Sequence, residues 1–194
     1  LPNFRLPTHI HSRSANAKWL TEIAHRNPIW IHTKDAERLG VNNGDLLKIT
    51  TAIGWFVDKV WVTEAIKPGV VACSHHIGRW RRQNDEGNRF MTNTVNIKNL
   101  GAGKWKMETI SGVEPWKTDD PDTNRIWWRD GGVHQNITHA TNPDPISGAH
   151  CWLQKVSISK PEKGEKYGDI FVDTNKSFKH FKKWNEWAKA RETH

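Results

Sequence analysis

Two adjacent β-strand patterns joined by one glycine constrain the fold of this chain more than any other feature. Residues 46–53 and 55–63 are rich in β-branched and aromatic side chains, which favour strands, and Gly54 lies between them. Asn43-Gly44 and Pro68-Gly69 are turn signals on either side of the pair. This spacing predicts a mainly β domain in which short strands follow one another through tight turns.

The same reasoning places further elements around this pair. Strands are expected at 4–12, 29–32, 70–76 and 152–158, and helices at 17–25, 34–40 and 177–191. Thr33 is the expected N-cap of the second helix, and Gly40 is its expected end. Residues 80–130 are charged and turn-rich, which is typical of a long irregular insertion. We therefore expect one domain at 1–160, followed at 161–194 by a polar linker and an amphipathic helix.

The final helix carries an aromatic stripe. Helical spacing places Phe178, Phe181, Trp184 and either Trp187 or Ala188 on one face. Such a stripe needs burial, either on the helix's own domain or on a partner subunit. Packing on its own domain is the favoured interpretation.

The charge of the chain indicates an anionic partner without selecting one. Lysine and arginine number 29 against 21 acidic residues, which gives a net charge of +8 and an isoelectric point near 9.6. Nucleic acid, anionic lipid, a phosphorylated cofactor or an acidic partner would fit this charge, and so would simple solubility. The sequence shows no signal peptide and no apolar run long enough to cross a bilayer. We expect a soluble domain, cytoplasmic or periplasmic, that reaches a membrane only through partners, and a first residue other than Met suggests a piece of a longer or processed protein.

A metal site is the obvious competing interpretation of the histidines. His9 and His11 would share one face of a strand, and His75 and His76 are adjacent in sequence. However, the two cysteines form no C-x-x-C motif, so neither an iron–sulfur ligand run nor a zinc ribbon is present. The histidine spacings match no structural zinc motif either, and we expect no metal ligand in this chain.

Three polar segments are candidate ligand-binding loops. Residues 8–16 combine imidazole, hydroxyl and guanidinium groups at a strand-to-helix junction, where backbone N–H groups can bind phosphate. Residues 74–80 end a strand with two histidines and then Gly78, which allows close backbone approach. Residues 136–148 form a rigid loop containing two prolines. Helix caps, a solvated basic loop and Asx turns would explain the same three segments without any ligand.

The segment 27–71 is similar to a known signature. Its matching positions are Asn27-Pro28, Ile31-His32, Asp35-Ala36, Leu39-Gly40-Val41, Gly44-Asp45, Ile49 and Lys67-Pro68-Gly69-Val70-Val71. This pattern resembles the molybdopterin-dinucleotide-binding domain of the dimethyl sulfoxide reductase family. The resemblance covers residues 3–160, with a poor match at 80–130. It implies a mainly β fold, a six-stranded double-psi β-barrel with short helices, that binds one of two pterin guanine dinucleotides.

The resemblance also implies a set of cofactor contacts. They are His11, Ser12, Arg13, Ser14 and Asn16 for the pterin or phosphates, His75, His76 and Gly78 for the pterin near the metal, and Asn136 and His139 as further contacts. The ligand of the metal comes from a middle domain in this family, so the catalytic residues are expected outside this chain.

The function implied by the resemblance is that of the cofactor-binding domain or subunit of a two-electron oxidoreductase, which would not be catalytic alone. The cofactor would be a bis(molybdopterin guanine dinucleotide) with molybdenum or tungsten, and an iron–sulfur cluster is expected only in the rest of the enzyme. Expected partners are the remainder of the catalytic subunit, an iron–sulfur electron-transfer subunit, and a membrane anchor subunit, with no nucleic acid.

Two further interpretations concern the substrate and the ligand. The run His9-x-His11-Ser12-Arg13 most resembles the branch of the family that acts on sulfur or arsenic compounds. The alternative function is a double-psi barrel module that binds a peptide or nucleic acid without a pterin. Strong, steeply salt-dependent binding of nucleic acid would distinguish that alternative.

Overall fold

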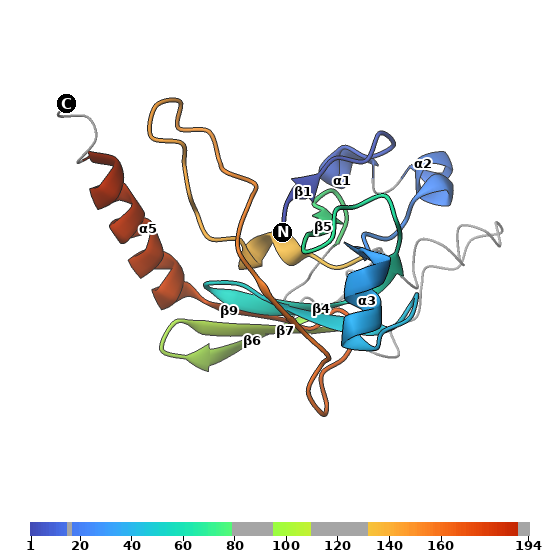
Figure 1. The fold of residues 1–194 in the computed structure, drawn as a ribbon. Helices are drawn as coiled ribbons and strands as arrows, with labels where there is room; N and C mark the ends of the chain where they lie inside the picture. Colours follow the sequence, from blue (N-terminus) through green and yellow to red (C-terminus); the bar gives the residue numbers. More distant parts are fainter. Residues whose placement is uncertain (15–16, 79–94, 110–131, 190–194) are drawn as a thin grey trace.

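The computed structural model describes residues 1–14, 17–78, 95–109 and 132–189 (Figure 1). Within these residues, nine strands form one open sheet that mixes parallel and antiparallel pairs. The strands are β1 (Asn3–Phe4), β2 (Ile29–Ile31), β3 (Leu46–Thr50), β4 (Gly54–Val62), β5 (Val71–Ser74), β6 (Val95–Gly101), β7 (Lys104–Thr109), β8 (Ser157–Ser159) and β9 (Ile170–Asp173). The helices are α1 (His11–Ser14), α2 (Lys18–Ile23), α3 (Thr33–Leu39), α5 (Thr174–Lys189) and the 3-10 helix η1 (Gln135–Thr138).

The strand pair expected around Gly54 is confirmed and forms the centre of the sheet. β3 runs antiparallel to β4, which also pairs with β2 and β9. Side chains from these strands make the main core, where the following are fully buried: Ile29, Ile31, Leu47, Ile49, Phe56 and Ile170. Each such side chain stabilises the fold by about 1.5–3 kcal/mol relative to an exposed one. Gly54 is the first residue of β4 rather than the turn itself. A Cβ there would lie 2.1 Å from the Phe171 carbonyl oxygen in β9, so this close approach of the two strands requires glycine.

Helix α3 is capped at both ends and bonds the Pro68-Gly69 turn. Its N-cap is His32, whose Nδ1 accepts the Lys34 backbone N–H at 3.1 Å, and not Thr33 as expected. Gly40 ends the helix as expected, in the left-handed conformation that suits glycine. Buried Asp35 accepts the Gly69 backbone N–H at 2.6 Å and so fixes the Pro68-Gly69 turn against the helix. These residues of the signature build the scaffold.

Several sequence expectations about the strands are wrong. A strand at 4–12 is not formed, because β1 ends at Phe4 and Pro7, which has no backbone N–H to donate, lies in a turn. The sheet has nine strands among the described residues rather than six. Part of the excess comes from the segment 80–130, where β6 and β7 form a hairpin instead of irregular chain. Apolar residues alternate with polar ones in both of these strands, at Val95 and Ile97 and again at Trp105 and Met107, which is a strand period.

The expected boundary at residue 160 also requires correction. β9 lies within the expected linker, yet it pairs with both β4 and β7 and therefore belongs to the sheet. Lys48 of β3 adds a side-chain contact to this region, because its Nζ bonds Glu162 at 2.9 Å and Glu165 at 2.5 Å. The last strand of the expected domain is also shorter than 152–158, since β8 covers only Ser157–Ser159.

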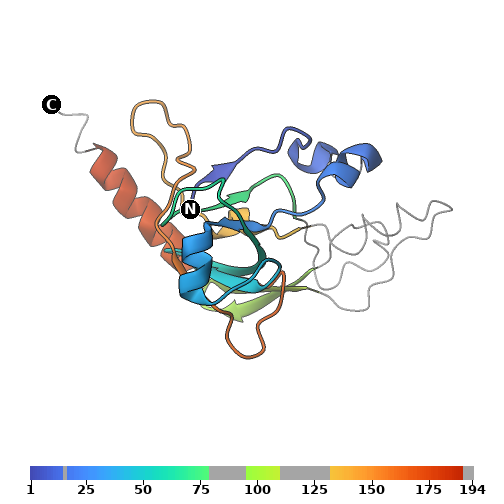
Figure 2. The ribbon, with the colours of Figure 1, turned by 45° about the vertical axis from the view of Figure 1, so that its right-hand side comes forward.

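Helix α5 runs outward from the end of β9 in both views (Figures 1 and 2). It begins at Thr174 because Asp173 Oδ1 accepts the backbone N–H groups of Asn175 and Lys176, which caps the helix. The expected packing of the aromatic stripe on this domain is wrong for Phe178, Phe181 and Trp187, which are exposed. No helix among the described residues is both long and apolar enough to span a bilayer.

Candidate functional site

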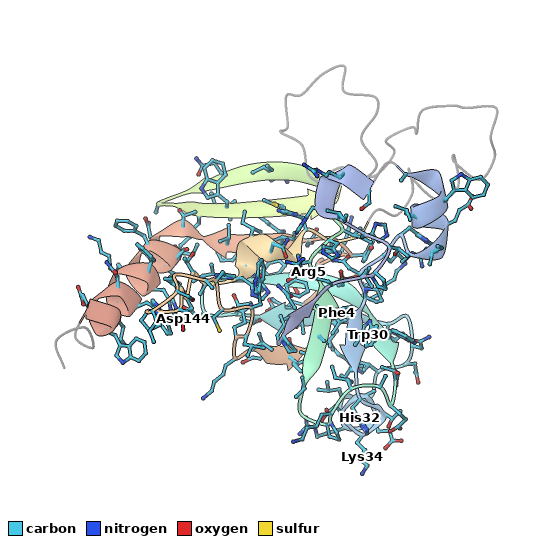
Figure 3. All side chains as sticks on the ribbon, turned by 90° about the horizontal axis from the view of Figure 1, so that it is seen from above. Phe4, Arg5, Trp30, His32, Lys34 and Asp144 are labelled. Atoms are coloured by element: carbon cyan, nitrogen blue, oxygen red, sulfur yellow. The ribbon has the colours of Figure 1, made fainter. Side chains whose placement is uncertain are left out.

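The candidate site forms where β1 and β5 end side by side. These two strands are parallel, with Phe4 paired to Ser74, so the residues that follow each strand emerge at one edge. His75 and His76 follow β5, are both buried, and have ring centroids 4.3 Å apart. Arg5 follows β1 and is exposed at the same edge (Figure 3).

His11 completes a cluster of three imidazoles. Its ring centroid lies 5.1 Å from that of His75 and 4.9 Å from that of His76. His11 is exposed and begins α1 with a φ of 45°, in a left-handed region that costs a residue with a Cβ roughly 1–2 kcal/mol. Backbone strain of this kind is often found at functional sites. The structure therefore brings together three of the residues that the sequence nominated from two separate loops.

The environment of the cluster keeps its buried histidines uncharged at neutral pH. Burial, followed by electrostatic repulsion from His11 and then from Arg5, lowers the pKa of His75. Burial, followed by repulsion from His75 and His11, lowers the pKa of His76 to about 4. A neutral imidazole can both donate and accept a hydrogen bond. The buried part of the site is consequently polar but uncharged, with a guanidinium at its edge.

The geometry of the cluster favours an organic ligand over a metal ion. One ligand nitrogen from each of His11, His75 and His76 lies within 4.8 Å of the others, a grouping that transition metals can use. However, the Leu6 backbone N–H donates to His76 Nδ1 at 3.1 Å, so neutral His76 carries its proton on Nε2. Binding a metal through Nε2 would transfer that proton to Nδ1, where it would face the Leu6 N–H. Hydrogen-bonding ligand groups avoid this conflict.

Trp152 forms an aromatic wall beside the cluster. Its indole stacks on His75 with centroids 4.9 Å apart and an interplanar angle of 21°, and His150 packs edge-on against it at 4.5 Å. The Asn3 backbone N–H donates to the Trp152 carbonyl at 3.0 Å and holds this part of the chain against β1. Trp152 remains 43% exposed, so part of the indole is available to a ligand.

Gly78 and Asn136 contact the backbone of the chain segments next to the cluster. A Cβ at Gly78 would lie 2.3 Å from the His134 backbone nitrogen, so only glycine fits at this crossing of two chain segments. Asn136 Nδ2 donates to the His75 carbonyl at 3.0 Å. Buried Asn27 joins the same two segments, because its amide bonds the Ser74 carbonyl and both backbone groups of Val133. These contacts position the two histidines without occupying their side chains.

The remaining nominated residues are placed less directly. Ser14 is buried, and its Oγ accepts the Ile10 N–H at 2.6 Å and lies 3.2 Å from His9 Nδ1, so it supports the loop. His139 lies deeper, where its Nε2 is 3.1 Å from both Asn3 Nδ2 and Gln135 Oε1. Arg13 is exposed on α1. The Ser12 side chain and all of Asn16 lie outside the described residues.

Sequence reasoning missed four residues of this site. Arg5 and Trp152 lie close to His75. Asn27 and Gln135 both bond the carbonyl of Ser74, the residue before His75. Gln135 Nε2 bonds Asn3 Oδ1 at 3.2 Å and Asn136 Oδ1 at 3.1 Å. Asn27 carried one local signal. The Asn27-Pro28 pair explains why the preceding helix ends, but it gives the side-chain amide of Asn27 no role. The positions of Arg5 and Trp152 depend on the β1–β5 pairing, which no local pattern reveals.

The comparison with protein families identifies this domain. Residues 1–102 match the family described as the molydopterin dinucleotide binding domain. This match covers more than half of the chain and includes β1–β5, His11, His75 and His76. The chain therefore belongs to that family.

Two curated relatives are consistent with this assignment. The chain is 35% identical over 78 residues to a putative dimethyl sulfoxide reductase catalytic subunit of Halobacterium salinarum, covering 40% of this chain and 9% of that protein. It is 35% identical over 111 residues to the molybdopterin-containing subunit of the arsenate respiratory reductase of Chrysiogenes arsenatis, covering 53% of this chain and 12% of that one. Acetylene hydratase from Pelobacter acetylenicus aligns in structure with a TM-score of 0.47 and 14% identity, over 82% of this chain and 18% of its own. The chain thus spans only about a tenth of the curated relatives it matches.

Proposed function

We propose that this domain binds one pterin guanine dinucleotide of a molybdenum or tungsten cofactor at the His11–His75–His76 cluster. The observation that carries this proposal is the convergence of the three imidazoles within the part of the chain that matches the dinucleotide-binding family. We also propose that strands β1–β5 with β9 form the core of a double-psi barrel. The presence of both parallel and antiparallel pairs among them supports this.

The chemistry of the cluster fits a pterin. A pterin is a flat, uncharged heterocycle whose edge alternates hydrogen-bond donors and acceptors, and neutral imidazoles can match both. Nδ1 of His75 is a buried polar atom without a hydrogen bond of normal geometry among the described residues, and the Phe4 backbone acts on this ring. The partly exposed Trp152 ring offers a surface on which a flat ring can stack.

The charged side chains fit the phosphates of the same molecule. Arg5 and Arg13 are exposed at either side of His11 along the chain. A guanidinium binds phosphate through two parallel hydrogen bonds, which an imidazole cannot do. In this proposal the histidines and Trp152 hold the pterin, the two arginines hold the pyrophosphate, and Asn136 and Gly78 keep the histidines in place.

At the level of the whole protein, we propose the catalytic subunit of a two-electron oxidoreductase. The names of the relatives, a dimethyl sulfoxide reductase and an arsenate reductase, suggest a small sulfur or arsenic compound as substrate. The metal centre would supply the redox chemistry, with its protein ligand and an iron–sulfur cluster in regions beyond this domain. The proposed partners are an iron–sulfur subunit together with a membrane anchor subunit.

Release of the cofactor from the purified full subunit tests this proposal. Acid extraction should yield an oxidised fluorescent pterin and GMP, and metal analysis should find molybdenum or tungsten. His76→Ala should reduce all three together, whereas His25→Ala, at a half-exposed histidine of the same domain, should not. A full-length protein that folds and contains no pterin would contradict the proposal. If it also bound nucleic acid with a steep salt dependence, the alternative binding module would be favoured.

A further inference from the structure

Helix α5 presents aromatic and lysine side chains that the proposed cofactor function does not use. Phe178 is 58% exposed and Phe181 39%. The helix contains five lysines, one glutamate and no arginine. Large exposed aromatic side chains beside several lysines are typical of a surface that binds a protein or a membrane.

The attachment of α5 to the domain shows which face remains open. His180 Nε2 bonds Asn142 Oδ1 at 2.5 Å, and Trp184 Nε1 donates to the Pro143 carbonyl at 2.7 Å. Residues 180 and 184 are four positions apart and share one face of a helix. Phe178 lies about 200° around the helix from His180 and so faces away from the domain. Among the described residues, the side-chain hydrogen bonds of α5 to the 142–150 loop thus come from its inner face, and Phe178 on the outer face is exposed.

Lysine and aromatic groups are combined on this outer face. Lys182 Nζ lies 4.6 Å from the centroid of the Phe178 ring, one turn away on the same side. The 142–150 loop lies on the opposite, inner side of the helix, where it bonds His180 and Trp184. The helix and the 142–150 loop together project from the sheet (Figure 1).

The composition favours a lipid surface over a protein partner. Protein interfaces are enriched in arginine and depleted in lysine, which is the reverse of α5. Helices that lie in a membrane interface combine lysine with Trp and Phe, because the aromatic rings enter the headgroup region while the ammonium groups reach the phosphates. We propose that the outer face of α5 binds an anionic lipid surface. This inference does not depend on the cofactor.

Cosedimentation of the full chain with vesicles tests this inference. Binding is expected to vesicles containing phosphatidylglycerol and to be much weaker with pure phosphatidylcholine. Lys182→Gln with Lys183→Gln should weaken binding to the anionic vesicles roughly thirty-fold, since each lysine near such a surface contributes about one factor of five. Phe178→Ala with Phe181→Ala should weaken it about tenfold.

Matched variants on other surfaces serve as controls. Lys34→Gln with Lys67→Gln removes two exposed lysines from α3 and the Pro68 turn, and Trp19→Ala with Ile23→Ala removes two exposed apolar side chains from α2. Both should retain binding, and circular dichroism should show that every variant keeps its helix content. Equal binding to neutral and anionic vesicles, no binding at all, or the same loss in the control variants would overturn the inference. So would capture of an acidic protein by α5 without any lipid affinity.

Discussion

The Trp152 indole stacks on the His75 imidazole at 4.9 Å, although the two residues come from loops far apart in the sequence. If this pair forms the wall against which a pterin lies, Trp152→Ala should make the full-length protein lose its pterin about two- to tenfold faster, because an aromatic pair contributes about 0.5–1.5 kcal/mol. Pterin fluorescence in the filtrate after dilution measures this rate.

A matched control is available for that variant. Trp61 is similarly exposed, at 40%, and packs edge-on against the Trp30 ring at 4.4 Å. Trp61→Ala should lose comparable packing yet leave pterin loss unchanged. The same acceleration in both variants would mean that Trp152 stabilises the fold and does not contact the cofactor.

Gly78→Ala should destabilise the domain by about 3 kcal/mol or more. The residue has a φ of 107°, and an added Cβ would lie 2.3 Å from the His134 nitrogen and 2.4 Å from the Val133 carbonyl carbon, neither of which can move without shifting the backbone. Gly148→Ala is the control, because its φ is 69° but nothing lies within 4 Å of an added Cβ. It should cost only about 1–2 kcal/mol. Urea unfolding measures both, and equal losses would show that the close crossing is not rigid.

The sequence predicts the parts of this fold that local patterns determine. The β3–β4 pair, α3 and the two histidines after β5 follow from strand composition, turn residues and the family signature. β9 could not be predicted, because Ile170–Asp173 is a four-residue strand within a polar segment and becomes a strand by pairing with β4 and β7. The approach of Arg5 and Trp152 to His75 likewise arises from long-range pairing, which a single sequence does not encode locally.

Arg5→Gln should raise the pKa of both His75 and His76. The Arg5 guanidinium opposes protonation of these rings, so removing its charge makes the imidazolium forms less unfavourable. Burial and the neighbouring histidines remain, so both pKa values should still lie below the ordinary range. Nitrogen-15 chemical shifts of the imidazoles, followed against pH, report each site. Arg38→Gln, on the outer side of α3, should leave both unchanged, and no shift in the Arg5 variant would place that guanidinium away from the cluster.

His139 should make the domain unstable in acid. Burial, followed by the charge of His150, lowers the pKa of His139 to about 4, so the folded state binds this proton less readily than the unfolded state does. The stabilising effect of its neutral form is complete above about pH 6.5 and is lost as the pH falls toward 4, by up to roughly 3 kcal/mol. His139→Gln should flatten the dependence of unfolding free energy on pH across that window. An unchanged slope in the His139 variant would contradict this origin of the acid sensitivity.

Lys48→Met should reveal how strongly the segment after residue 160 is joined to the sheet. The Lys48 side chain is 9% exposed and bonds both Glu165, which is 11% exposed, and Glu162, which is 78% exposed. Removing the ammonium leaves the Glu165 carboxylate buried without its cation, which should cost about 3 kcal/mol in urea unfolding. Glu162→Gln should cost less than about 1 kcal/mol, because its carboxylate stays in water. Adding Glu165→Gln to Lys48→Met should restore much of the lost free energy of unfolding, since the second change removes the unpaired carboxylate. If the loss persists, it arises instead from the contact of Lys48 with Trp55, whose ring centroid lies 4.4 Å from the ammonium.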